Sequence, residues 1–163
     1  MLILSKKHKQ MVKINEKIKD FEILLTGNKK AKLSDYQGKY LVLYFYPKAS
    51  TPGCTTESCD FTELFPKFSQ SNANILGVSK DTLKRQENFK EKYNFAFDLI
   101  ADTEEEICNY FGVIQEKKNY GKTYMGIVRS TFVIDQDGKL IKHWDKVRVK
   151  GHAQEVYEFI ESL

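Results

Sequence analysis

The sequence predicts an α/β fold in which a central mixed β-sheet is flanked by helices. Two observations carry this prediction: short apolar strand patterns alternate with longer amphipathic helix patterns, and the chain closes with a hairpin signal followed by a helix. The clearest strand is 40–46, which is apolar on both faces, as expected inside a covered sheet. The hairpin signal is the turn Asp-Gln-Asp-Gly at 135–138, between two apolar stretches.

The other elements follow in order along the chain. Apolar runs bounded by turn residues predict strands at 21–25, 40–46, 75–79, 98–100, 131–134 and 139–144. Amphipathic runs predict helices at 54–69, 83–93, 104–111 and 152–161. This order, with strands and helices alternating before a hairpin and a last helix, is typical of a thioredoxin-like domain with additional elements.

The composition indicates one soluble globular domain. The chain has 163 residues, of which 41% are hydrophobic and 29% charged, which allows a sizeable core and argues against disorder. Residues 1–32 hold nine lysines and three acidic residues, whereas the rest is nearly neutral, so the basic character belongs to the N-terminal stretch. We expect a loose basic extension over 1–11 and a single folded domain over 12–163.

Membrane and secreted classes are not expected. No apolar run approaches the roughly 18 residues of a membrane helix. The first residues lack the order of a secretory signal, in which positive charges precede a longer apolar stretch. Three cysteines, an odd count, argue against a secreted disulfide scaffold. We therefore expect a cytoplasmic protein.

One cysteine stands where reactivity is expected. The strand 40–46 ends before Pro47, and the chain must turn before the next helix. Thr51 is a suitable N-cap and Pro52 suits the first helical position, which places Cys54 in the first turn. There the unpaired backbone N–H groups and the helix dipole favour a thiolate, the reactive form of cysteine. The plainer alternative is a small buried apolar residue, but the Thr-Pro-Gly-Cys setting favours a reactive sulfur.

The same segment resembles a known family. Pro47, Thr51 and Cys54 fit the Pro-x-x-x-Thr/Ser-x-x-Cys signature of peroxiredoxins. The longer string Tyr-Phe-Tyr-Pro-Lys, followed by Thr-Pro-Gly-Cys-Thr-Thr-Glu, resembles the bacterioferritin comigratory protein branch, also called peroxiredoxin Q. Further matching segments occur in the same order at 35–39, 129–135 and 149–153.

The resemblance implies a role for each residue of the site. Cys54 would attack the peroxide O–O bond and become a sulfenic acid. Thr51 would hydrogen-bond the sulfur and the peroxide, and Pro47 would shield the site from water. Arg129 would stabilise the thiolate and the charge that develops on the leaving oxygen. Glu57 would orient Arg129.

The same subfamily commonly resolves the sulfenic acid with a cysteine at the position of Cys59, which would form an intramolecular disulfide with Cys54. In a helix, two residues five positions apart have Cα atoms about 8.7 Å apart, whereas a disulfide tolerates at most about 6.8 Å. The first turns would therefore have to unwind. The alternative for Cys59 is a passive helix residue. Cys108, beside Ile107 and Phe111, is expected to pack in the core.

The expected partners follow from the same resemblance. They are a hydroperoxide substrate and a thioredoxin-type thiol reductant. We expect a monomer that needs no cofactor and binds neither nucleic acid nor a membrane.

Other functions fit the sequence less well. The histidines and cysteines show no zinc-ligand spacing, and the Cys-x-x-Cys motif of disulfide oxidoreductases is absent from the sequence. A redox-switched binding module or holdase, in which Cys54 reacts without turnover, stays open. So does a nucleic-acid-associated protein that acts through the lysines of 1–32.

Overall fold

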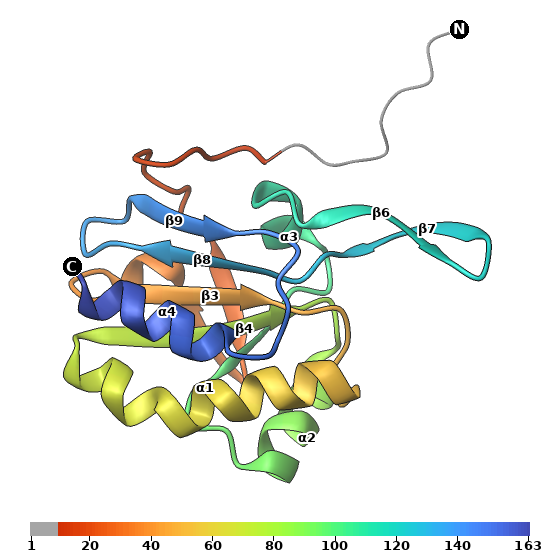
Figure 1. Ribbon diagram of the computed structural model, residues 1–163, viewed down its shortest axis with the longest axis horizontal. Helices are drawn as coiled ribbons and strands as arrows, with labels where there is room; N and C mark the ends of the chain where they lie inside the picture. Colours follow the sequence, from red (N-terminus) through yellow and green to blue (C-terminus); the bar gives the residue numbers. More distant parts are fainter. Residues whose placement is uncertain (1–9) are drawn as a thin grey trace, which may run out of the picture.

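A mixed sheet of seven strands forms the centre of the computed structural model, which describes residues 10–163 (Figure 1). The strand order is β2-β1-β5-β4-β3-β8-β9. The strands are β1 (Glu22–Leu25), β2 (Lys29–Lys32), β3 (Tyr40–Phe45), β4 (Ala73–Ser79), β5 (Leu99–Ala101), β8 (Ser130–Ile134) and β9 (Leu140–Trp144). The neighbours β3, β4 and β5 are parallel, whereas β8 runs antiparallel to β3, so the predicted mixed sheet is confirmed.

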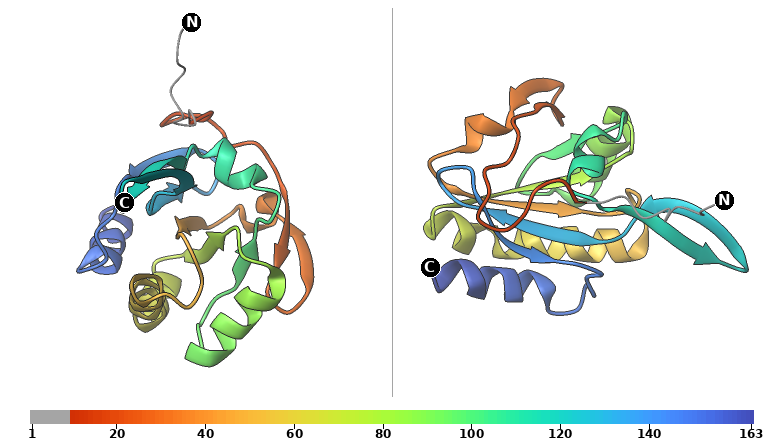
Figure 2. Two further views of the ribbon diagram at one scale, coloured as in Figure 1. Left: turned by 90° about the vertical axis from the view of Figure 1, so that its right-hand side faces the viewer. Right: turned by 90° about the horizontal axis from the view of Figure 1, so that it is seen from above.

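Four helices cover the sheet. They are α1 (Pro52–Gln70), α2 (Leu83–Tyr93), α3 (Glu106–Tyr110) and α4 (His152–Glu161). A short 3-10 helix, η1 (Leu33–Tyr36), follows β2. Helices α1 and α4 lie side by side beneath the sheet (Figure 2). The predicted helices all exist, and α2 and α4 have the predicted bounds.

The core has two layers because the residues of β3 alternate between the faces of the sheet. Val42, Tyr44 and Tyr46 face the layer that contains Phe61 of α1 and Val156 of α4. The intervening residues of the strand face the other layer, which includes the buried residues of α3 and the N-terminal segment from Val12 onward. Residues 1–9, which make up most of the expected extension, lie outside the described part of the chain.

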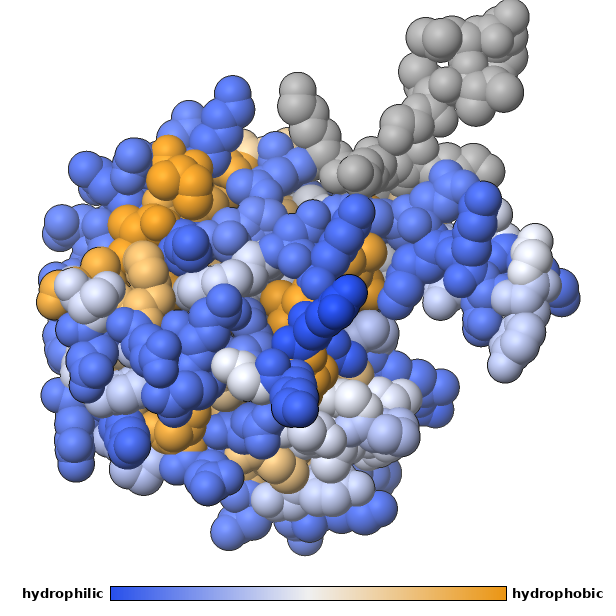
Figure 3. Space-filling view, in the orientation of Figure 1, coloured by the Kyte–Doolittle hydropathy of each residue, from blue (hydrophilic) through white to orange (hydrophobic). Residues whose placement is uncertain are grey.

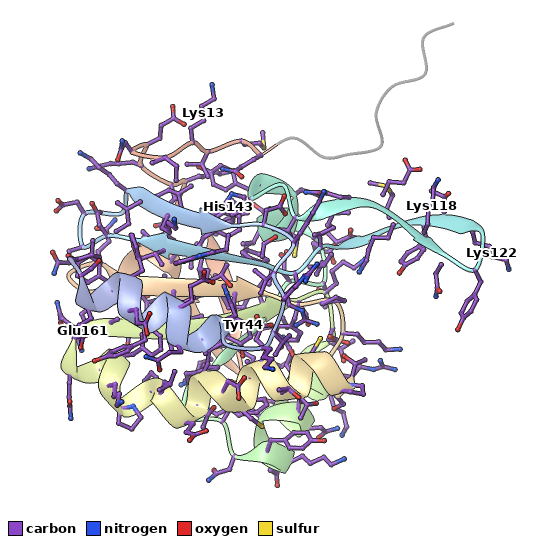
Figure 4. All side chains as sticks on the ribbon, viewed as in Figure 1. Lys13, Tyr44, Lys118, Lys122, His143 and Glu161 are labelled. Carbon is purple, nitrogen blue, oxygen red and sulfur yellow. The ribbon has the colours of Figure 1, made fainter. Side chains whose placement is uncertain are left out.

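A second, two-stranded sheet was not predicted. Strands β6 (Ile114–Asn119) and β7 (Lys122–Ile127) form an antiparallel hairpin that projects from the body (Figures 1 and 2). Its surface is mainly hydrophilic (Figure 3), and Tyr120 at the tip is 98% exposed. Lys118 and Lys122 extend outward from it (Figure 4). Within residues 10–163, no helix has the length and apolar character needed to cross a bilayer.

Candidate active site

The end of β3 and the start of α1 position Cys54. Thr51 precedes the helix in an extended conformation, and Pro52 is the first helical residue, because its fixed φ suits that position and its missing N–H is not needed there. Pro52 thus takes the predicted first helical position, two residues before the predicted range 54–69, and Cys54 lies within the first turn. The cysteine is only 1% exposed, and the backbone N–H groups of this turn have no partner inside the helix.

The loop before the helix presents Pro47 and Thr51. Thr51 occupies the predicted N-cap position, but its side chain makes no capping hydrogen bond, and its hydroxyl donates to the carbonyl of Lys48 at 2.8 Å. Within the described residues, the hydroxyl makes no hydrogen bond to the Cys54 sulfur either. With its proton donated to Lys48, the oxygen of Thr51 can still accept a hydrogen bond from another donor. Pro47 is half-buried at the end of β3, and the backbone N–H of Ala49 donates to Asp81 Oδ2 at 2.8 Å, which ties down the loop.

Arg129 lies directly before β8, the antiparallel neighbour of β3 in the sheet. Phe45 pairs with Ser130 in the register of β3 and β8, so Arg129 lies level with the end of β3. Its Nη2 donates to the Cys54 sulfur at 3.4 Å, and its Nη1 donates to Glu57 Oε1 at 2.6 Å. A Cβ atom on Gly53 would lie 3.2 Å from Nη2. Because glycine has no side chain, the guanidinium has room beside the sulfur.

Glu57 lies one helical turn after Cys54 and is almost fully buried. Burial raises the pKa of Glu57 to about 7, while the charge of Arg129 and its hydrogen bond oppose that rise. Its second oxygen, Oε2, has no hydrogen-bond partner within residues 10–163. The carboxyl group thus depends on Arg129 alone for its polar contact, and the two side chains hold each other in place.

The family follows from comparison with known proteins. Residues 14–143 match the AhpC/TSA family. Peroxiredoxin Bcp of Bacillus subtilis is 48% identical over 152 residues, which is 93% of this chain and 97% of that protein. Peroxiredoxin Bcp of Xanthomonas campestris is 48% identical over 137 residues, with 84% and 86% covered. The chain belongs to the AhpC/TSA family, in the Bcp/PrxQ subfamily of peroxiredoxins.

Solved structures agree with this assignment. The bacterioferritin comigratory protein of Xanthomonas campestris, studied for its alkyl peroxide reduction, superposes with a TM-score of 0.84 at 45% identity, covering 87% of this chain and 90% of its own. A cysteine-to-serine mutant of Xylella fastidiosa PrxQ gives a TM-score of 0.90 at 39% identity, covering 94% and 98%. The thioredoxin-like fold and the peroxiredoxin activity predicted from the sequence are both confirmed.

Two more cysteines of this peroxiredoxin are free thiols. Cys59 is partly exposed on α1, and burial, followed by the charge of Asp60, raises its pKa. Cys108 is fully buried in the core, and its pKa is raised well above the ordinary value by burial and then by Asp102. A thiol that is buried and protonated is a poor nucleophile, so Cys59 is the better placed of the two for thiol exchange.

Lys117 is a member of the site that the sequence analysis missed. Its Nζ donates to the carbonyl of Ile127 at 3.0 Å, two residues before Arg129. Burial lowers the pKa of Lys117, and the charge of Arg129 lowers it further, whereas the Cys54 sulfur acts in the opposite direction. The hairpin of this peroxiredoxin thus places a second basic side chain near Arg129 and Cys54.

A metal site is not evident in the described part of the peroxiredoxin. Across residues 10–163, no group of three or more histidine, cysteine, aspartate or glutamate side chains is arranged to hold an ion.

Proposed function

We propose that this peroxiredoxin reduces hydrogen peroxide and organic hydroperoxides, alkyl peroxides among them, through Cys54. The thiolate attacks one peroxide oxygen, the O–O bond breaks, and the sulfur keeps that oxygen as a sulfenic acid. The other oxygen leaves as an alkoxide or hydroxide and takes up a proton. The observation that carries the proposal is the guanidinium of Arg129, 3.4 Å from the sulfur, because it can stabilise negative charge on both the sulfur and the leaving oxygen.

Cys59 then resolves the sulfenic acid in this proposal. Its thiol attacks the Cys54 sulfur, the S–O bond breaks, and water leaves as the disulfide forms. A thioredoxin-type dithiol reduces that disulfide and restores both thiols. The partial exposure of Cys59 supports this role, and so does its place on the same helix as Cys54. The chain alone supplies Cys54, Cys59 and Arg129, which supports a monomeric enzyme.

Mass spectrometry after one equivalent of peroxide tests the proposal. The wild-type protein should lose two hydrogen atoms, and peptide mapping should join Cys54 to Cys59. Cys54→Ser should abolish peroxide consumption with a thioredoxin-type reductant, and Cys59→Ser should accumulate the sulfenic acid. Cys108→Ser is the matched control and should turn over like the wild type.

Each part of the proposal has its own contrary result. Peroxide turnover by Cys54→Ser would overturn the assignment of the attacking sulfur. A disulfide to Cys108, or a stable sulfenic acid in the wild type, would overturn the role of Cys59. Oxidation of Cys54 without steady turnover would favour the redox-switched binding module instead.

A further inference from the structure

A buried hydrogen bond joins the sheet to the cysteine-bearing part of α1. The hydroxyl of Tyr44, on β3, donates to Ser58 Oγ at 2.8 Å. Both residues have an exposed fraction of 0%, so water does not compete for this bond. Ser58 lies between Cys54 and Cys59 in the chain, directly before the second cysteine. The bond therefore anchors the stretch of helix that separates the two thiols.

The ring of Tyr44 is held so that it cannot follow the helix outward. It meets Phe97 edge-on at 5.8 Å and stacks on Phe61, which belongs to α1 but lies beyond Cys59, with ring centroids 4.7 Å apart. A Cβ atom on Gly77 would lie 2.7 Å from Tyr44 Cζ, which shows how closely the ring packs on the neighbouring strand β4. Figure 4 shows Tyr44 in the interior, between the sheet and α1. If Ser58 moves, the hydrogen bond must break.

Disulfide formation requires Ser58 to move. The helical positions of Cys54 and Cys59 put their Cα atoms about 8.7 Å apart, which exceeds the limit of about 6.8 Å for a disulfide. The segment 54–59 therefore cannot keep its helical geometry in the disulfide form, and Ser58 lies within this segment. Tyr44 and Ser58 thus oppose the movement that brings the two sulfurs together.

We propose that Tyr44 and Ser58 form a latch that keeps residues 54–59 helical and sets how fast the sulfenic acid becomes a disulfide. The inference rests on the proposed disulfide between Cys54 and Cys59. Both residues act on the reaction through the position of the helix rather than by contact with the peroxide, so they are positioning residues.

The latch affects whether the sulfenic acid is oxidised further or forms the disulfide. While the helix is closed, a second peroxide molecule can transfer an oxygen to the sulfur, which gives a sulfinic acid and an alcohol. Once the helix is open, the thiol of Cys59 displaces water and forms the disulfide. A net contribution typical of one hydrogen bond corresponds to about a twofold to tenfold change in the opening equilibrium. We expect that factor in the rate of disulfide formation.

The test compares Tyr44→Phe with Tyr46→Phe. Tyr46 is the matched control. It faces the same core layer as Tyr44 and is equally buried, but its hydroxyl hydrogen-bonds Gln86 on α2 rather than a residue of α1. After rapid mixing with peroxide, two rates are measured separately: oxidation of Cys54, and the later step that forms the disulfide. The yield of sulfinic acid at high peroxide concentration is a third measurement.

Tyr44→Phe should form the disulfide about twofold to tenfold faster and give less sulfinic acid, with the oxidation rate of Cys54 unchanged. Tyr46→Phe should match the wild type in all three measurements. Ser58→Ala removes the other half of the latch and should act in the same direction, which keeps the test decisive if Tyr44→Phe fails to fold. A purely structural role would lower stability without separating the two rates.

Two contrary results are distinguishable. If the wild type forms the disulfide and Tyr44→Phe and Ser58→Ala form it at the same rate, the latch is wrong and the proposed function stands. If the wild type forms no disulfide between Cys54 and Cys59, the role of Cys59 and the latch are overturned together.

Discussion

Replacing Glu57 with glutamine should change how the stability of this peroxiredoxin depends on pH. Burial raises the pKa of Glu57 from 4.5 to about 7, in spite of the ion pair with Arg129. The folded protein therefore holds this proton more tightly than the unfolded chain. The resulting stabilisation is fully present below about pH 4.5 and is lost as the pH rises through about 7.

The size of the change in stability follows from the rise in the pKa of Glu57. Because one pKa unit equals about 1.4 kcal/mol, a rise from 4.5 to about 7 corresponds to about 3 kcal/mol of unfolding free energy. Glutamine has no proton to lose. The stability of Glu57→Gln relative to the wild type should therefore increase by about 3 kcal/mol between about pH 4 and about pH 8.5. A constant effect of the substitution on packing cancels from this comparison.

Urea unfolding of the reduced proteins over this pH range measures the difference directly. Glu63→Gln is the control, because it removes an exposed carboxylate from the same helix and should change the pH dependence only slightly, through the neighbouring Asp60. A stability difference between Glu57→Gln and the wild type that stays constant with pH would refute the reasoning. It would mean that Glu57 is ionised equally readily in the folded and the unfolded protein.

Three further predictions concern the site and its helix. Arg129→Met should slow oxidation of Cys54 by peroxide about 100-fold, as loss of one donor to a developing charge does in other enzymes; an unchanged stopped-flow rate would exclude a role in this step. Hydrogen exchange of the amides at 56–61 should be faster in the oxidised enzyme than in the reduced one, because the disulfide requires unwinding, and equal protection would contradict this. Gly77→Ala should lower the free energy of unfolding by about 1–3 kcal/mol, because the new Cβ meets the ring of Tyr44, and thermal unfolding measures the loss.

Most of the sheet could be predicted because burial on both faces leaves a strong pattern. The run 40–46 is apolar throughout, and its residues alternate between two core layers. The last helix could be predicted to its ends, since Gly151 precedes it in a left-handed conformation and its apolar residues recur at helical spacing. In both the strand and the helix, the spacing of apolar residues in the sequence matches the residues that are buried in the structure.

The strands that escaped prediction lack such a pattern. Strand β2 is rich in lysine, and the hairpin of β6 and β7 has mostly polar or exposed residues along its outer part. Its turn uses Tyr120 at φ 51°, where asparagine, aspartate or glycine is the usual signal. The contribution of Lys117 was missed for the same reason, because the strand that carries it was not recognised.

Local sequence patterns also predicted some features of the site and missed others. The helix start at Pro52 and the place of Cys54 could be argued from local residues alone. The meeting of Arg129 with Glu57 was implied only by family resemblance, since the two are 72 positions apart and no local pattern joins them. The direction of the Thr51 hydroxyl could not be predicted, because its acceptor, the Lys48 carbonyl, is placed by the conformation of the loop rather than by a local sequence pattern.

The long separation between Cys54 and Arg129, 75 positions in the chain, has a consequence for biosynthesis. A chain grows from its N-terminus, so the cysteine leaves the ribosome well before the arginine is made. Strand β8 must then pair with β3 before the guanidinium can reach the sulfur. A nascent chain therefore carries Cys54 before the guanidinium of Arg129 can lie beside it. In the proposed mechanism, the thiol gains the support of this charge only when most of the chain has been made.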